Sequence, residues 1–298
     1  LTALTSGAGN TAVGYQAGLE IETGARNTML GYGAMRDSLA SLASNDNTFI
    51  GHTAGGGTWL TAASSANTAV GTYAMDAAMN GAGSNTCIGE SSLGALTEGD
   101  GNAALGNQSG DSVTTGSFTT CLGFYSDAAA TADNQIAIGY GAVTDGANKG
   151  RWGNSSIGTN NIQTDWTVDS DRRIKKDIED SDIGLSFVNS LKPRKFKKIH
   201  PSEYDAELLE ERYKKGGSNY DDDKDEVVKD EFDDEKVWDG LIAQEVKESM
   251  DALGVEFSGW GEESNGKQGI TYSTLVTPLI KAVQELSAKV EELEAKLK

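Results

Sequence analysis

The chain has 298 residues, a formal net charge of −20 and a sequence pI near 4.4, so its field repels nucleic-acid backbones and anionic membrane surfaces. It is 37% hydrophobic, too apolar for a disordered chain, yet it holds 37 Gly and only 7% aromatic residues. Two cysteines are too few for a disulfide framework or a zinc site, and we expect no metal and no cofactor. No stretch approaches the ~18 apolar residues of a membrane span, so we expect no membrane insertion. The sequence begins at Leu1 rather than Met, as a fragment would.

A five-residue phrase recurs along the N-terminal half: Asn, a small residue, any residue, an aliphatic residue and Gly. Six clear copies occupy residues 10–14, 27–31, 47–51, 67–71, 85–89 and 102–106. Degenerate copies end at Gly123, Gly139 and Gly158. Consecutive repeat glycines are 16 to 20 residues apart.

This repetition predicts a β-solenoid. Each copy offers about five residues of strand with alternating apolar positions, and such units bury their apolar faces only by stacking. We expect about two short strands in each coil, with the repeat Gly allowing close approach of another backbone. Alanines three residues after a repeat Gly predict a second inward layer: Ala17, Ala34, Ala54, Ala74 and Ala142. Cys87 and Cys121 occupy the same position in two different repeats and are predicted to be small buried side chains.

The variable spacing predicts loops on one edge of the stack, such as residues 37–46 and 56–66. Because loops carry recognition more often than strands do, His52, Trp59 and Tyr73 are candidates for a receptor contact. Ordinary surface loops explain them equally well. The repeats hold no pair of carboxylates at a spacing that indicates a glycan hydrolase.

Residues 8–160 resemble the head repeats of trimeric autotransporter adhesins, with their Asn-x-x-aliphatic-Gly-x-x-Ala rolls, and similar repeats in phage tail fibres. The resemblance implies rolls that associate as trimers on cells or virions. The spacing here is longer and less regular than in those heads, which argues against a strict single coil for each repeat.

A second pattern begins where the charge rises abruptly. Ser170, Asp171, Arg173 and Lys175 match the Ser-Asp-x-Arg-x-Lys signature that opens the intramolecular chaperone domain of phage tailspikes, endosialidases and tail fibres. That domain also occurs in the membrane-bound myelin regulatory factors. Three further blocks resemble the family in the same order: a first helix at 184–191, a Gly-Leu-Ile-Ala-Gln-Glu-Val block at 240–246, and a Tyr-x-x-Leu pattern with a terminal helix at 270–286.

The resemblance implies self-cleavage of the peptide bond between Asp169 and Ser170. Ser170 would be the nucleophile and Lys175 its base, and a lysine must be made neutral, for example by burial, to act in this way. Side chains five residues apart on one helix point about 140° apart, so Ser170 must precede the helix, or the lysine comes from a neighbouring subunit. Asp171 and Arg173 are expected to hold the turn through a salt bridge, with nearby amides facing the oxyanion. The alternative is that Ser170 is only a helix N-cap.

The last segment carries a heptad seam. Its apolar residues are spaced 4, 3, 4, 3 and 4 residues apart: Leu279, Val283, Leu286, Val290, Leu293 and Leu297. Val at a and Leu at d mildly favour two strands, whereas the chaperone resemblance implies three. About three heptads are too few to hold a multimer alone.

Together these patterns predict a mainly β solenoid at 1–160, a junction at 161–169, a small α+β chaperone domain at 170–274 and a coiled-coil helix at 275–298. An insert at about 216–236 is strongly acidic, which predicts a solvated loop; a loose cation site is the alternative.

The predicted function is a homotrimeric phage tail-fibre or tailspike segment whose C-terminal domain is a trimerisation chaperone that cleaves itself once. A host-surface receptor or glycan is a further expected partner, and the virion is the expected location. The alternative is a non-cleaving structural adhesin or fibre on a cell surface, with a permanent trimerisation foot.

Overall fold

The computed structural model describes the chain except for residues 38–42, 164–165, 218, 264 and 298. The predicted loop at 37–46, the junction at 161–169, the acidic insert and the end of the last helix therefore lie partly outside the described residues. The chain forms two compact units. One contains residues 1–157 together with 211–228, and the other contains residues 158–210 and 229–298.

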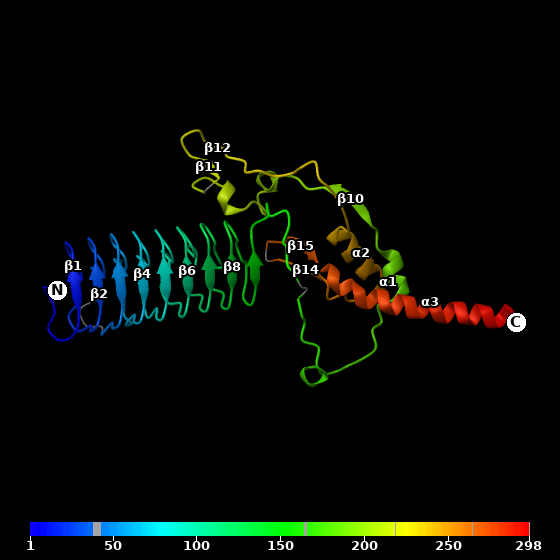
Figure 1. Cartoon of the computed structure of the whole chain (residues 1–298), viewed down its shortest axis with the longest axis horizontal. Helices are drawn as coiled ribbons and strands as arrows, with labels where there is room; N and C mark the ends of the chain where they lie inside the picture. Colours follow the sequence, from blue (N-terminus) through cyan, green and yellow to red (C-terminus); the bar gives the residue numbers. More distant parts are fainter. Residues whose placement is uncertain (38–42, 164–165, 218, 264, 298) are drawn as a thin grey trace. The chain divides into compact units, whose positions relative to one another are not determined.

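The N-terminal unit contains a nine-stranded parallel sheet in strict sequence order, which confirms the predicted β-solenoid (Figure 1). Its three-residue strands are β1 (Thr11–Val13), β2 (Thr28–Leu30), β3 (Thr48–Ile50), β4 (Thr68–Val70), β5 (Thr86–Ile88), β6 (Ala103–Leu105), β7 (Thr120–Leu122), β8 (Ile136–Ile138) and β9 (Gly150–Trp152). Equivalent residues of neighbouring repeats pair directly, as Phe49 does with Ala69. Each repeat thus forms one coil with a single strand, so the expectations of two strands per coil and of a looser relation between repeats and coils were wrong. The turns between the strands differ in length, which accounts for the variable spacing of the repeats.

The repeat glycines end each strand because no other residue fits there. Gly71 has a φ of +148°, and a Cβ at this position would lie 2.2 Å from the Gly89 carbonyl oxygen of the next coil. The close approach expected at these glycines is therefore confirmed. The final repeat glycine is Gly153, directly after β9, and not Gly158 as the spacing suggested. The last coil is shorter and carries Trp152 where the other repeats carry an aliphatic residue. For these two reasons the sequence pattern did not identify it as a repeat.

The solenoid core is a narrow column filled from two rows. The middle residue of each strand points inward, and those of β2 to β8 are at most 4% exposed: Met29, Phe49, Ala69, Cys87, Ala104, Cys121 and Ala137. The second row, Ala17 to Ala142, is equally buried, as predicted. Trp59 is also fully buried, against Phe49 and with its indole nitrogen 3.1 Å from the Gly55 carbonyl. It is a core residue, so its assignment to a recognition loop was wrong.

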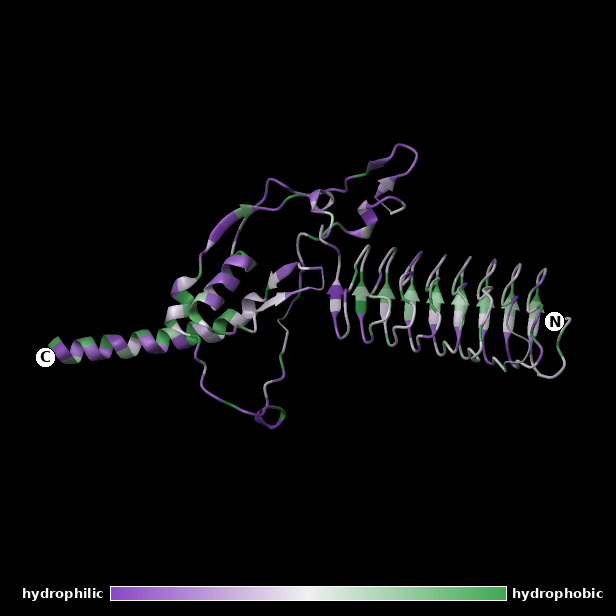
Figure 2. Cartoon of the chain, turned by 180° about the vertical axis from the view of Figure 1, so that it is seen from behind, coloured by the Kyte–Doolittle hydropathy of each residue, from purple (hydrophilic) through white to green (hydrophobic). Residues whose placement is uncertain are grey.

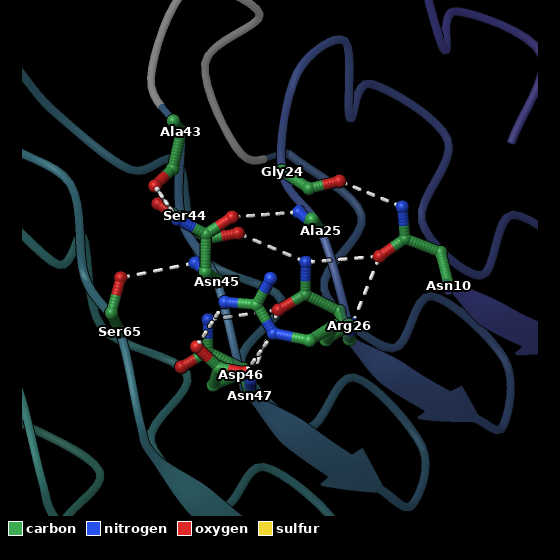
Figure 3. Close-up of polar contacts among 11 residues, drawn as sticks. Asn10, Gly24, Ala25, Arg26, Ala43, Ser44, Asn45, Asp46, Asn47 and Ser65 are labelled. Carbon is green, nitrogen blue, oxygen red and sulfur yellow. Dashed lines mark hydrogen bonds and ion pairs between the residues drawn. The ribbon is translucent and has the colours of Figure 1, made fainter. Parts of the chain in front are cut away.

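A ladder of buried asparagine side chains runs through the coils. In the clear repeats the first Asn donates its side-chain amide to a turn carbonyl, as Asn67 does to Ala82 at 2.9 Å. From Asn10 to Asn67 the side-chain oxygen accepts two bonds from the Asn of the next coil, at 3.0 and 3.1 Å between Asn67 and Asn85. Figure 3 shows the first coils, with the Asn10 amide directed at the Gly24 carbonyl. The ladder therefore satisfies the backbone of both the strand and the turn at a position that water does not reach.

The second unit is the small α+β region that the sequence predicted. Its helices are α1 (Leu185–Ser190), α2 (Ala243–Leu253) and α3 (Val276–Leu297), and its strands are β10 (Arg194–Lys197), β13 (Val237–Gly240), β14 (Trp260–Glu262) and β15 (Gln268–Ile270). Short 3₁₀ turns are η1 (Arg172–Ile174), η2 (Pro201–Glu203) and η4 (Tyr272–Leu275). Phe187 of α1, Val246 and Met250 of α2, and Phe257 form its buried core. Among the described helices, none is long and apolar enough to cross a membrane.

We expect Asn67→Ala to destabilise the solenoid by about 3 kcal/mol or more, since it leaves buried partners of at least two hydrogen bonds unsatisfied. Asn107→Ala is the matched control, because the Asn107 side chain bonds only to the exposed Glu90 carboxylate among the contacts described for it. This change should cost less than about 0.5 kcal/mol. Urea unfolding followed by circular dichroism measures both, and equal midpoints for the two variants would contradict a structural role of the ladder.

Burial raises the pKa of Asp127, whose carboxylate accepts backbone bonds from Ser112 and Ala128, and nearby Asp111 raises it further. An acid with a raised pKa favours the folded state while protonated and opposes it once ionised. Wild-type stability should therefore fall, relative to Asp127→Asn, as the pH rises from about 4 through the folded-state pKa. Urea midpoints measured between pH 3.5 and 7.5 test this, and a difference that does not change with pH would refute it.

Candidate functional site

Ser170 opens a short surface turn. The next residue, Asp171, caps η1, because its carboxylate accepts a bond from the Arg173 amide at 2.8 Å. The same carboxylate forms an ion pair with the Arg173 guanidinium at 2.6 Å. The ion pair lowers the pKa of Asp171, so the carboxylate stays charged and holds the turn. Since its amide is engaged by Asp171, Arg173 does not offer that N–H to an oxyanion.

The turn brings Ser170 and Lys175 together. Lys175 follows η1, and its Nζ donates a hydrogen bond to Ser170 Oγ at 2.6 Å. Residues 172–174 form a tight 3₁₀ turn and the flanking residues are extended, so side chains five residues apart lie on the same side. A regular α-helix would have separated them. The structure therefore places a hydroxyl and an amine from one chain within hydrogen-bond distance.

Both side chains face water in the single chain. Residues 166–180 are exposed throughout, and η1 contributes no buried residue. A lysine accepts a proton only in its neutral form, which burial favours. The pair thus has the contact needed for proton transfer but lacks the enclosed surroundings that would activate the amine.

The family-like blocks further along the chain meet in the chaperone region. The Tyr272 hydroxyl accepts a bond from the Leu241 amide at 2.7 Å, and a Cβ on Gly240 would lie 2.6 Å from that hydroxyl. A side chain at Gly240 would therefore displace the tyrosine that packs over it. Arg194 of β10 forms a two-bond ion pair with Glu245 of α2, so the 240–246 block also joins this strand to the helix.

Helix α3 contacts α1, whose first amide, that of Leu185, donates to the Glu285 carboxylate at 2.9 Å about midway along α3. Its predicted seam, however, has no partner surface in the described part of the single chain. The six seam residues are between 46% and 87% exposed, the last being Leu297. Figure 2 shows apolar and polar residues alternating along this helix. Such an apolar stripe on an isolated helix requires neighbouring helices to cover it.

The acidic insert, predicted as a solvated loop, contains secondary structure. It contains a hairpin of β11 (Tyr220–Asp221) and β12 (Glu226–Val227), preceded by η3 (Glu211–Tyr213). Several carboxylates pair with lysines, as Asp225 does with Lys215 at 2.8 Å. No cluster of metal-ligating side chains occurs among the residues described.

Sequence reasoning missed a contact that residues before and within the insert make with the last coils of the solenoid. Arg212 is 4% exposed, and its guanidinium donates to Ser156 at 3.0 Å and lies over the Tyr140 ring. The Tyr140 hydroxyl donates to Asn219 of the same insert. No local pattern distinguishes Arg212 from the exposed arginines of the chain, so only the tertiary structure reveals this contact.

The candidate residues thus form two groups: a Ser–Lys contact with its supporting ion pair at residues 170–175, and the exposed seam of α3. Comparison with known families adds one finding. Residues 170–255 match the family model described as chaperone of endosialidase, and the match begins at Ser170. Searches of curated proteins and of solved structures gave no significant match. Residues 170–255 of this chain therefore form a domain of the chaperone of endosialidase family, downstream of the β-solenoid.

Proposed function

We propose that the chain is part of a homotrimeric phage tail fibre or tailspike, and that its C-terminal domain aligns three chains during folding and then cuts itself from the solenoid. The family match supports the chaperone role and homotrimeric assembly. The exposed seam of α3 supports a parallel bundle of helices. A virion location and a host-surface receptor or glycan as partner follow from this role.

The proposed cleavage uses the contact between Ser170 and Lys175, and this contact is the observation that carries it. Lys175 removes the hydroxyl proton, and Ser170 Oγ attacks the carbonyl carbon of Asp169. The C–N bond of that peptide then breaks, and the amine of Ser170 leaves with the proton that Lys175 holds. Asp169 is now esterified to Ser170 Oγ, and water hydrolyses the ester to a carboxylate and a free hydroxyl.

The exposure of the pair makes this activity conditional. Burial favours a neutral amine, so in this proposal Lys175 acts as a base only when other chains enclose it. Cleavage would then follow assembly and mark the chains that have folded together. The competing role of Ser170, a helix cap, is weakened because Asp171 supplies the capping bond.

We expect wild-type protein to give two fragments, residues 1–169 and 170–298, on a denaturing gel after assembly. Ser170→Ala and Lys175→Arg should remain whole, since one lacks the nucleophile and the other cannot act as a neutral amine base. Loss of the base should slow the cut at least ~100-fold. Lys176→Arg is the matched control and should cut like wild type.

Light scattering of the same samples separates cleavage from assembly. A trimeric Ser170→Ala protein that stays whole would support both parts of the proposal. A wild-type trimer that remains uncut would favour the non-cleaving adhesin or fibre with a permanent trimerisation foot, and a monomeric Ser170→Ala protein would reject the chaperone role.

A further inference from the structure

The outer face of the solenoid sheet carries a continuous row of apolar side chains. Strands β1 to β8 alternate, so the middle residue points into the core and the third residue points outward. These third residues, which we call the outer ladder, are Val13, Leu30, Ile50, Val70, Ile88, Leu105, Leu122 and Ile138. Several are well exposed, among them Val13 at 56% and Leu105 at 50%. Figure 2 colours most of these strands toward the hydrophobic end of its scale.

Two positions along the chain from the ladder, exposed aromatic residues extend this face at both ends of the sheet, whereas the middle coils carry Thr72, Glu90 and Asn107 there. The rings of Tyr15 and Tyr32 stack at 5.4 Å, those of Tyr32 and His52 stack at 5.0 Å, and Phe124 is 45% exposed. With side chains of this size about half exposed, the two rows offer on the order of 1,000 Å² per chain. A patch on a typical monomer reaches only about 300–600 Å², whereas a standard interface buries about 800 Å² per partner.

The charge pattern shows what kind of surface this is. Neither the first nor the third residue of any strand from β1 to β8 is charged; the first residues are six threonines, Ala103 and Ile136. A sheet face that remains in water normally alternates with charged or strongly polar residues. A chain with a net charge of −20 that leaves every strand position of this face uncharged, with Glu90 as the one acidic residue in the adjoining row, is built to have the ladder covered.

A second copy of the same chain fits this face best. An acidic copy is repelled by most of the molecule, but it meets no strand charge here, and it presents an apolar row of the same length and spacing. The α3 seam of the same chain is also apolar and exposed, and bundling of three such helices would raise the local concentration of three solenoids. We propose that the outer ladder is the surface along which the three solenoids pack in parallel. This proposal rests on the homotrimer of the proposed function.

The ladder also has a weakness that the chaperone domain would correct. Neighbouring rungs are chemically alike, so a slip of one coil sets Ile88 of one chain against Leu105 of another at almost no cost in buried apolar area. A shift of about 4.8 Å along the sheet is therefore poorly resisted by the ladder. It follows that the register is set outside the ladder, by the chaperone domain and its helix α3.

Disulfide trapping in the full chain with Ser170→Ala tests the surface. Leu105→Cys lies on the ladder, and Leu60→Cys is the matched control, since Leu60 is 43% exposed but lies on a loop. Cys87 and Cys121 can stay, because both are buried and burial raises the pKa of each to about 12. On a non-reducing gel, Leu105→Cys should give covalent dimers at least ~10-fold above Leu60→Cys.

Light scattering measures the mass of the assembly and so separates failure of the ladder from failure of trimerisation. A trimer in which Leu105→Cys links no better than Leu60→Cys would overturn the ladder while leaving trimerisation intact. A monomeric mass would overturn the ladder together with the proposed function.

Co-expression of Ile88→Cys chains with Leu105→Cys chains tests the register. Mass spectrometry should find links between position 88 and position 105 rare in the full chain, compared with links between equal positions. Adding Val283→Lys in the α3 seam should raise the mixed links to a level similar to the equal ones. Mixed links that stay rare would show that the ladder itself sets the register, and a loss of all links would show that the ladder does not hold the chains together. Either result would contradict the proposal.

Discussion

The buried asparagine ladder is the interaction on which the solenoid depends. A coil of 14 to 20 residues has too few internal contacts to fix its own path, and its turns differ in length and sequence. One amide per coil binds the turn carbonyl of its own coil and the strand amide of the next, so it closes each coil and aligns it with its neighbour. Variable turns are tolerated because the ladder, with the repeat glycine beside it, keeps the strand positions constant.

With the strands aligned in this way, alternation of side chains creates both the core and the outer ladder. The inward residues fill a column so narrow that alanine and cysteine suffice for most coils. The outward residues then form an uncharged apolar face, and the helix at the other end of the sequence exposes an apolar seam. Both surfaces, like the contact between Ser170 and Lys175, are exposed in the single chain, and the proposed trimer would cover them. Assembly is thus the condition that connects folding, packing and the proposed chemistry.

Several expectations failed for a common physical reason. Trp59 was assigned to a recognition loop because the variable repeat spacing placed it in an insertion, but it fills a space beside Phe49 of β3. The last repeat ends at Gly153 because β9 pairs with β8, not because its sequence resembles the repeat. Arg212 is buried by Ser156, 56 residues away in the sequence. Each depends on contacts between distant residues, which composition and spacing do not record.

The sequence by itself determined the repeats, the inward alanines and cysteines, the order of the chaperone blocks and the heptad seam, because these follow from short periodic patterns of side-chain size and polarity. Only the tertiary structure decided that each repeat forms one coil with one strand, since turn lengths do not reveal which backbones pair. It also decided that a 3₁₀ turn, capped by Asp171, brings Lys175 to Ser170. That geometry depends on the path of the backbone between the two residues, which their spacing of five leaves open.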